Sequence, residues 1–173
     1  FIVIILIPTI VFICTRISAH YKVVADTLKI DNSTLVLTPL RNRVFLPISG
    51  ITSVSVYALR FCMSISAEVT GLYINVNQET TEKIKAQIEK MNLPIPFTII
   101  DSPFRSVTEP LIDFIDEQSR TRPDDIITLV IPEFMPRRKW HYFLHNQTAM
   151  VIYAALRGRE NVVITSVRKR IMK

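Results

Sequence analysis

Residues 44–50, which read VFLPISG, decide the fold that the sequence predicts. A short apolar run that is closed by Ser49 and Gly50 is typical of a buried β-strand. Thr52 or Ser53 can then cap a helix, because apolar residues recur at helical spacing from Val54 onward. A strand followed directly by an amphipathic helix is the repeating unit of α/β folds.

The same alternation continues on the carboxyl side of this unit. Further apolar runs predict strands over residues 69–76, 97–100, 126–131 and 162–167. Between them we predict a helix capped by Asn77, a helix that begins with a capping box of Ser106 and Glu109, and a long helix over residues 140–157. The strand runs are continuous rather than alternating, as in a parallel sheet covered on both faces. The sequence therefore predicts an α/β domain with a parallel five-stranded sheet.

The other end of the chain has a different composition. Residues 1–15 carry no charge, and Ile, Val, Leu or Phe fill eleven of the first fourteen positions. Residues 1–18 would span roughly 27 Å as a helix, about the thickness of a bilayer's hydrocarbon core. A signal peptide would carry its basic residues before the apolar run, whereas Arg16 and Lys22 follow it. A buried core helix is rarely β-branched on every face, so we predict a transmembrane helix.

Three parts are therefore expected: a last transmembrane helix over 1–18, an amphipathic juxtamembrane segment and connector over 19–40, and an α/β domain over 41–173. Because the chain starts inside an apolar run, we expect further membrane helices upstream in a multi-pass parent protein. Basic residues just after the helix place the domain in the cytoplasm by the positive-inside rule, so the expected location is the cell membrane.

A ligand site is expected at the carboxyl ends of the strands, where open α/β sheets bind ligands. Four segments follow predicted strand ends there. They are residues 47–50, 101–106 and 132–136, and the tail after Thr165 and Ser166. Loops at helix starts are rich in turn residues in any such fold, so the alternative is that these segments only connect elements.

Four spaced motifs resemble one known family. They are PISG at 47–50, DSPFRS at 101–106, DDIITLVIPEFMPRRKW at 124–140 and LHNQT at 144–148. Together they resemble the cytosolic C-terminal domain of APC-superfamily permeases, in particular KimA-type potassium importers. The resemblance implies a universal-stress-protein-like sheet of order 3-2-1-4-5, a potassium–proton symporter, a homodimer, and inhibition by cyclic di-AMP at the cytosolic domain.

One departure from ATP-binding universal stress proteins concerns the segment after the fourth strand. Those proteins have a glycine-rich phosphate loop there, whereas this chain has PEFMP at residues 132–136. The whole chain contains only three glycines. A close backbone cradle for a triphosphate is therefore not expected.

The charge distribution points separately to an anionic partner. Residues 135–173 contain nine Lys or Arg and one Glu. The preceding residues contain twelve Lys or Arg and fourteen Asp or Glu. The candidates are lipid headgroups of the inner leaflet and a nucleotide with two phosphates. Nucleic acid is not expected, because no binding module is recognised. A solvated basic face is the alternative.

Six residues are the predicted nucleotide contacts: Ser49, Gly50, Arg105, His145, Asn146 and Thr165. Arg105 adjoins an expected helix N-terminus and would meet a phosphate, although it could instead form a surface ion pair. His145 and Asn146 would meet a base or ribose, or could pack their helix onto neighbouring loops.

No metal site, no cofactor other than this regulatory ligand, and no enzymatic activity are predicted. His141 and His145 are four residues apart, but no third ligand accompanies them. Ser49 lies outside any nucleophile-elbow pattern. The leading prediction is a cytosolic regulatory domain of a potassium–proton symporter that senses cyclic di-AMP and inhibits transport. The alternative is a dimerisation module of an amino-acid permease that binds no small molecule.

Overall fold

The computed structural model describes residues 2–29, 39–102, 106–135 and 147–170. The chain forms two compact units, Phe1–Pro39 and Leu40–Lys173. The predicted contacts Arg105, His145 and Asn146 lie outside the described residues, as do residues 140–146 of the predicted last helix.

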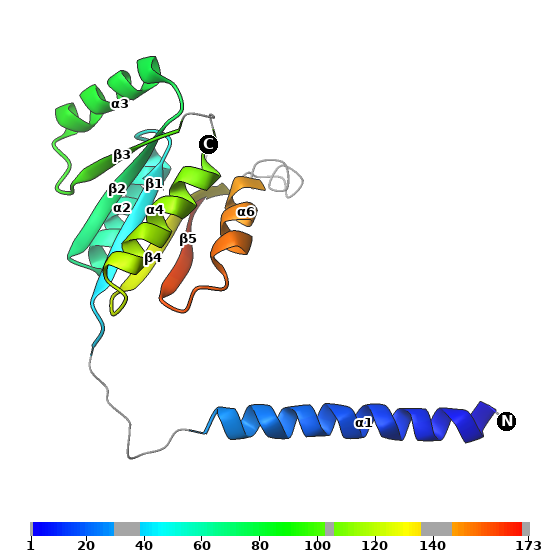
Figure 1. Cartoon of the computed structure of the whole chain (residues 1–173). Helices are drawn as coiled ribbons and strands as arrows, with labels where there is room; N and C mark the ends of the chain where they lie inside the picture. Colours follow the sequence, from blue (N-terminus) through cyan, green and yellow to red (C-terminus); the bar gives the residue numbers. More distant parts are fainter. Residues whose placement is uncertain (1, 30–38, 103–105, 136–146, 171–173) are drawn as a thin grey trace. The chain divides into compact units, whose positions relative to one another are not determined.

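The described residues of the first unit form the helix α1 (Ile2–Thr27), shown in blue in Figure 1. It is long and apolar enough to cross a membrane, with a mean hydropathy of 2.4 in its most apolar window. Its apolar side chains are exposed, and none of its residues is buried against protein. The helix contains Pro8 and continues beyond the predicted span of 1–18 into the juxtamembrane segment.

The second unit is built on a parallel sheet with the strand order β3-β2-β1-β4-β5. This confirms the predicted fold class and strand order. The strands are β1 (Asn42–Ile48), β2 (Glu68–Asn75), β3 (Phe97–Asp101), β4 (Ile126–Met135) and β5 (Val162–Arg170). The chain order runs outward from β1 to β3 on one side and from β4 to β5 on the other, so the strand order reverses between β1 and β4.

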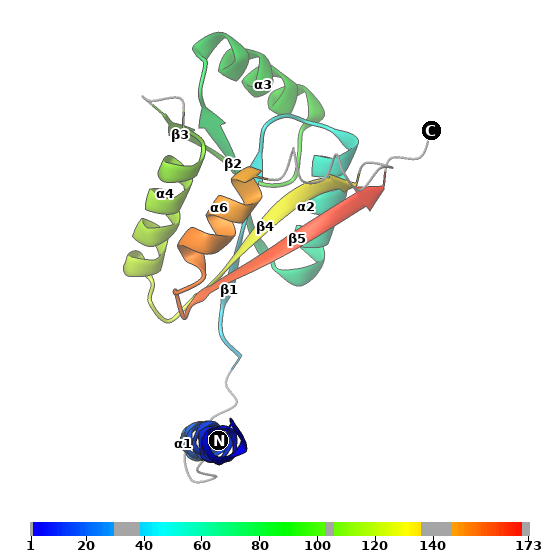
Figure 2. The same ribbon diagram turned by 90° about the vertical axis from the view of Figure 1, so that its right-hand side faces the viewer.

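Helices cover both faces of the sheet, as Figures 1 and 2 show together. They are α2 (Ser53–Ile65), α3 (Gln78–Met91), α4 (Thr108–Thr121) and α6 (Gln147–Leu156). On one face, Phe45, Leu129 and Ile131 pack against residues of α4 and α6. On the other, Val44 and Leu46 pack against residues of α2. Successive side chains of β1 therefore point alternately into two separate cores, one on each face of the sheet.

Local capping explains where two of the helices begin. Thr52 accepts from the backbone N–H of Ser55, and the Ser55 hydroxyl accepts from the backbone N–H of Thr52, which makes a complete capping box. Asn77 caps α3 through its side-chain oxygen, as predicted. Asn92 ends α3 in the left-handed conformation with φ 44°, which Asn tolerates better than most residues.

The predicted capping box of Ser106 and Glu109 is wrong. Helix α4 begins at Thr108, and its N-cap Val107 makes no side-chain hydrogen bond. The carbonyl of Ser106 instead accepts a hydrogen bond of 2.6 Å from the hydroxyl of Ser102. Ser106 therefore lies before the N-cap residue of α4.

The sequence predicts that β4 ends at Ile131 and that a loop segment begins at Pro132. This prediction is wrong, because Pro132 still belongs to the strand. Strand β4 continues to Met135, and β5 continues to Arg170, with Met135 paired to Arg170. The physical reason is the pairing itself, because each strand satisfies the other's backbone groups past the point where the apolar run ends.

Candidate functional site

The carboxyl edge of the sheet has a step at the switch point between β1 and β4. In the parallel register Phe45 lies beside Leu129, so continuing it would place Ile48 beside Pro132. Glu133 to Met135 therefore extend past the end of β1. The chain leaves β1 for α2 on one face of the sheet, and this step creates the corner where the predicted contacts Ser49 and Gly50 lie.

Ser49 and Gly50 follow β1 directly at this corner. Ser49 is exposed and Gly50 is half-buried. The carbonyl of Gly50 accepts a hydrogen bond of 3.0 Å from the hydroxyl of Ser55, which ties the loop to α2. Gly50 has no positive φ, and a Cβ there would lie 3.8 Å from the side chain of Ile84. Neither the conformation nor the space requires glycine at position 50.

The first turn of α2 adds donors to the same corner. The capping box uses the amide of Ser55, whereas the amides of Ser53 and Val54 have no hydrogen-bond partner among the described residues. Free amides at a helix start favour an anion. The Lys169 ammonium donates to the carbonyl of Ser53 at 3.0 Å and lies 5.8 Å from the ring centroid of Tyr57. A positive charge from β5 thus lies beside the α2 N-terminus.

Thr165 occupies a different level of the sheet. It is half-buried on β5 opposite Val130, two residues before the buried Val167. Since β5 runs on to Arg170, Thr165 lies inside the strand and not at its carboxyl end. The structure therefore brings Ser49 and Gly50 together but does not bring Thr165 to the same loop.

Sequence reasoning missed a charged pair near this edge. Glu133 is 6% exposed, and its Oε2 accepts from Nε of Arg168 at 3.0 Å. The two residues are direct cross-strand neighbours, so the pairing of β4 with β5 creates the contact. One signal was present in the sequence. No Gly or Pro follows Val167 before Arg170, so nothing there ends the strand.

Three groups whose pKa values are shifted, in Cys62, Asp116 and Arg159, lie away from the corner formed by Ser49 and Gly50. Burial raises the pKa of the Cys62 thiol to about 12, because the core disfavours the thiolate. Hydrogen bonds from Arg159 lower the pKa of Asp116, whose carboxylate in turn raises the pKa of Arg159. Among the described residues, no group of three or more His, Cys, Asp or Glu side chains could hold a metal ion. The corner is therefore a polar, cationic edge suited to binding an anion.

Comparison with known proteins gives two consistent matches. A family model described as the KimA potassium transporter C-terminal domain matches residues 41–169. The potassium transporter KimA of Bacillus subtilis (strain 168) is 23% identical to this chain over 169 residues. That similarity covers 95% of this chain and 27% of the transporter, so the chain spans about a quarter of the length of this relative.

Proposed function

Since the chain belongs to the family of KimA potassium transporter C-terminal domains, we propose that it regulates a potassium–proton symporter by binding cyclic di-AMP. In this proposal α1 is the last transmembrane helix of a multi-pass transporter in the cell membrane. The α/β domain is cytoplasmic, because Arg16 and Lys22 follow the apolar part of α1. The domain acts as a sensor and performs no catalysis.

The observation that carries the nucleotide proposal is the contact of Lys169 with the carbonyl of Ser53 at the start of α2, where the amides of Ser53 and Val54 have no hydrogen-bond partner within the described part of the chain. One phosphate of the ligand would occupy this corner beside Ser49 and Gly50. The other predicted contacts, Arg105, His145, Asn146 and Thr165, stay part of the proposal. Arg105 would meet the second phosphate, and His145 and Asn146 would meet base or ribose.

The extended β4 favours a ligand with two separate phosphates over a triphosphate. ATP-binding relatives of this fold place a flexible glycine loop where β4 here continues as paired strand to Met135. Beyond the end of β1, the N–H groups of β4 that point toward β5 are used in the ladder, so they are not available to surround a phosphate chain. The donors at the corner are correspondingly few, which suits one phosphate at a time.

We also propose that the transporter is a homodimer and that β5 and α6 contribute to its interface. Strand β5 is an edge strand, and Val163 on it is 45% exposed. A cavity of about 670 Å³ next to it is lined by Met150, Tyr153, Ala154, Arg157, Val162 and Ile164. The opposite edge strand, β3, is only five residues long and follows Pro94 and Pro96, which protect an edge from pairing.

The same apolar edge supports the alternative function, a dimerisation module of an amino-acid permease without a ligand. The two functions differ in one measurement. We expect the chain in lipid nanodiscs to bind cyclic di-AMP in isothermal titration calorimetry, and we expect Lys169→Gln to weaken binding by roughly tenfold, because a charged hydrogen bond is lost. The matched control is Lys83→Gln, since Lys83 lies on the exposed face of α3.

A second measurement tests regulation. Potassium uptake by the full transporter in proteoliposomes should fall when cyclic di-AMP is added on the domain side. A ligand shifts a conformational equilibrium only by its differential affinity for the two states. Absence of binding at millimolar cyclic di-AMP would leave the dimerisation module as the function. Binding without an effect on uptake would remove the regulatory role.

A further inference from the structure

A second cavity, of about 430 Å³, lies at the opposite, amino-terminal edge of the sheet. It lies between the C-terminal half of α4 and the first residues of β1, β2 and β3. Its floor is formed by Phe45, Thr70, Thr98 and Phe114, its wall by Arg43 and its rim by Glu68 and Arg122. Ser49 follows Arg43 by six residue steps along β1, roughly 20 Å in an extended strand. The cavity is therefore separate from the proposed nucleotide corner.

The floor of the cavity offers unused hydrogen-bonding groups. The hydroxyls of Thr70 and Thr98 make no hydrogen bond within the described part of the chain, and both residues are half-buried. Beside them lie the rings of Phe45 and Phe114, which pack edge to face with centroids 5.3 Å apart. The floor thus combines free hydroxyls with an apolar surface.

The wall of the cavity is formed by Arg43, whose guanidinium group is held by protein partners. Arg43 donates through Nη1 and Nη2 to the side chain and the carbonyl of Gln118, each at 2.8 Å. Its Nε also lies 3.0 Å from the Asp125 carboxylate. Arg43 therefore shapes the cavity and is not free to bind a ligand.

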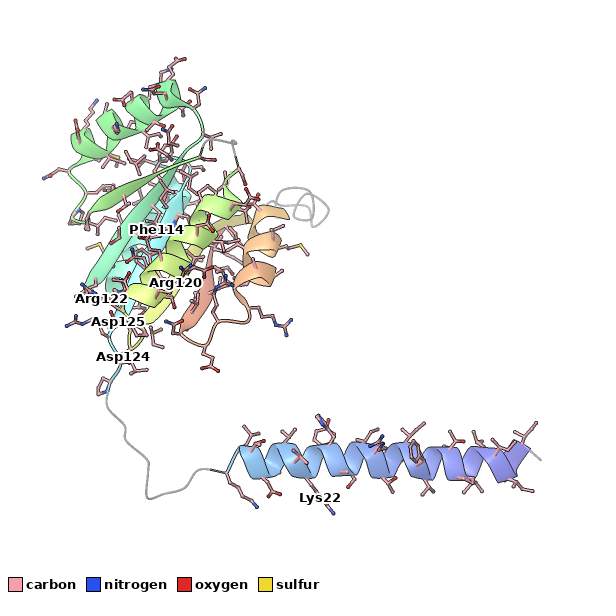
Figure 3. The ribbon with its side chains drawn as sticks, viewed as in Figure 1. Lys22, Phe114, Arg120, Arg122, Asp124 and Asp125 are labelled. Atoms are coloured by element: carbon pink, nitrogen blue, oxygen red, sulfur yellow. The ribbon has the colours of Figure 1, made fainter. Side chains whose placement is uncertain are left out.

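The rim carries two charges that are only loosely paired. Nη1 of Arg122 lies 3.8 Å from Glu68 and equally 3.8 Å from Asp125, beyond hydrogen-bond distance. Arg41 approaches Glu68 at 3.5 Å. The side chains of Arg122 and Glu68 are about half exposed, at 51% and 47%. Figure 3 shows Phe114 on α4 and Arg122 just after the end of the same helix.

We infer that this cavity binds a small zwitterion, of the kind represented by a free aliphatic α-amino acid. The Arg122 guanidinium pairs with the ligand carboxylate and the Glu68 carboxylate with its ammonium group. The threonine hydroxyls complete the hydrogen bonding, and the aliphatic side chain lies on Phe45 and Phe114. Because the two charged groups are half exposed and screened, we expect affinity in the millimolar range. This site does not rest on the nucleotide proposal.

The test is saturation-transfer NMR of L-leucine with the whole chain in lipid nanodiscs, with empty nanodiscs as the blank. Two analogues lack one charge each: isoamylamine has no carboxylate, and 4-methylpentanoate has no ammonium group. We expect L-leucine to bind with millimolar affinity and each analogue at least tenfold more weakly. Equal binding of 4-methylpentanoate and leucine would overturn the assignment, because Glu68 would then have no role.

Variants of the cavity residues test whether leucine binds at this cavity. Arg122→Gln and Glu68→Gln should each weaken leucine binding by roughly tenfold or more, since each removes one charged hydrogen bond. Thr98→Val keeps the shape and removes one hydroxyl, so a smaller loss is expected. Lys83→Gln on α3 is the matched surface-charge control and should bind as the parent does. No leucine binding at 50 mM, or full binding by both charge variants, would refute the inference.

Discussion

Gly71 and Phe97 form a direct cross-strand pair, in which the ring of Phe97 covers the Cα of Gly71. A Cβ at position 71 would lie 3.0 Å or less from three ring carbons. The backbone of Gly71 does not need positive φ, so glycine is required here by space alone. The ring in turn packs against the core that α2 forms with the sheet.

Gly71→Ala should therefore destabilise the domain by about 1 to 3 kcal/mol, because the ring must move out of its rotamer or the strands must separate. Chemical denaturation of the chain in micelles, followed by circular dichroism, measures this loss. Gly158→Ala is the matched control, since nothing lies within 4 Å of a Cβ at that exposed position. Adding Phe97→Ala should make the Gly71→Ala effect smaller, as expected for residues in contact.

Arg43 should contribute more to stability than Arg41, although both lie near the start of β1 and have acidic partners. Arg43 and Asp125 are 9% and 13% exposed, whereas Arg41 and Glu68 are 62% and 47% exposed. Nε of Arg43 and Oδ2 of Asp125 are 3.0 Å apart but not aligned for a hydrogen bond, so they form an ion pair.

Arg43→Gln should lower the free energy of unfolding by roughly 2 to 4 kcal/mol, because it removes the nearer of the two cationic partners of the largely buried Asp125 carboxylate and the hydrogen bonds to Gln118. Arg41→Gln should change the same quantity by less than about 1 kcal/mol. Thermal and denaturant unfolding of both variants provide the comparison. Equal effects from the two substitutions would contradict the assignment of Arg43 as a buried structural residue.

The contact between Asp116 and Arg159 predicts a pH dependence of stability. Nη2 of Arg159 donates to Asp116 at 2.6 Å, and this hydrogen bond lowers the pKa of Asp116 in the folded state. The resulting stability is present above the carboxyl's unfolded pKa of about 3.9 and is lost as pH falls through the lower folded pKa.

Asp116→Asn should lower the free energy of unfolding by about 1 kcal/mol at pH 7, with the deficit disappearing as the pH falls below the lowered pKa of Asp116. The comparison variant is Asp113→Asn, on the exposed face of the same helix, which should show little effect at either pH. A deficit that is equally large at pH 2.5 would mean that the aspartate charge is not the cause.

Cys62 should react with maleimide only when the domain opens. The thiol is fully buried, and burial raises its pKa to about 12, so almost no thiolate is present at pH 8. In a Cys14→Ser background, the labelling rate should rise with urea in parallel with unfolding. Labelling of native protein as fast as of unfolded protein would show that α2 opens locally.

The sequence alone predicted the class, the strands and the apolar N-terminal helix, because these depend on the local order of apolar and polar residues. The strand order came from a resemblance of spaced motifs, and the structure confirmed it. The capping of α2 and α3 was also readable, since a cap and its partner are two or three residues apart.

Only the tertiary structure decided the length of β4 and β5 and the places where polar groups meet. Glu133 and Arg168 become neighbours because two strands pair beyond their apolar runs, 35 residues apart in the chain. The cavity at the amino edge likewise joins α4 to β1, β2 and β3. Such contacts depend on lateral register and on which helix covers which strand, and neither is encoded by the spacing of residues within one element.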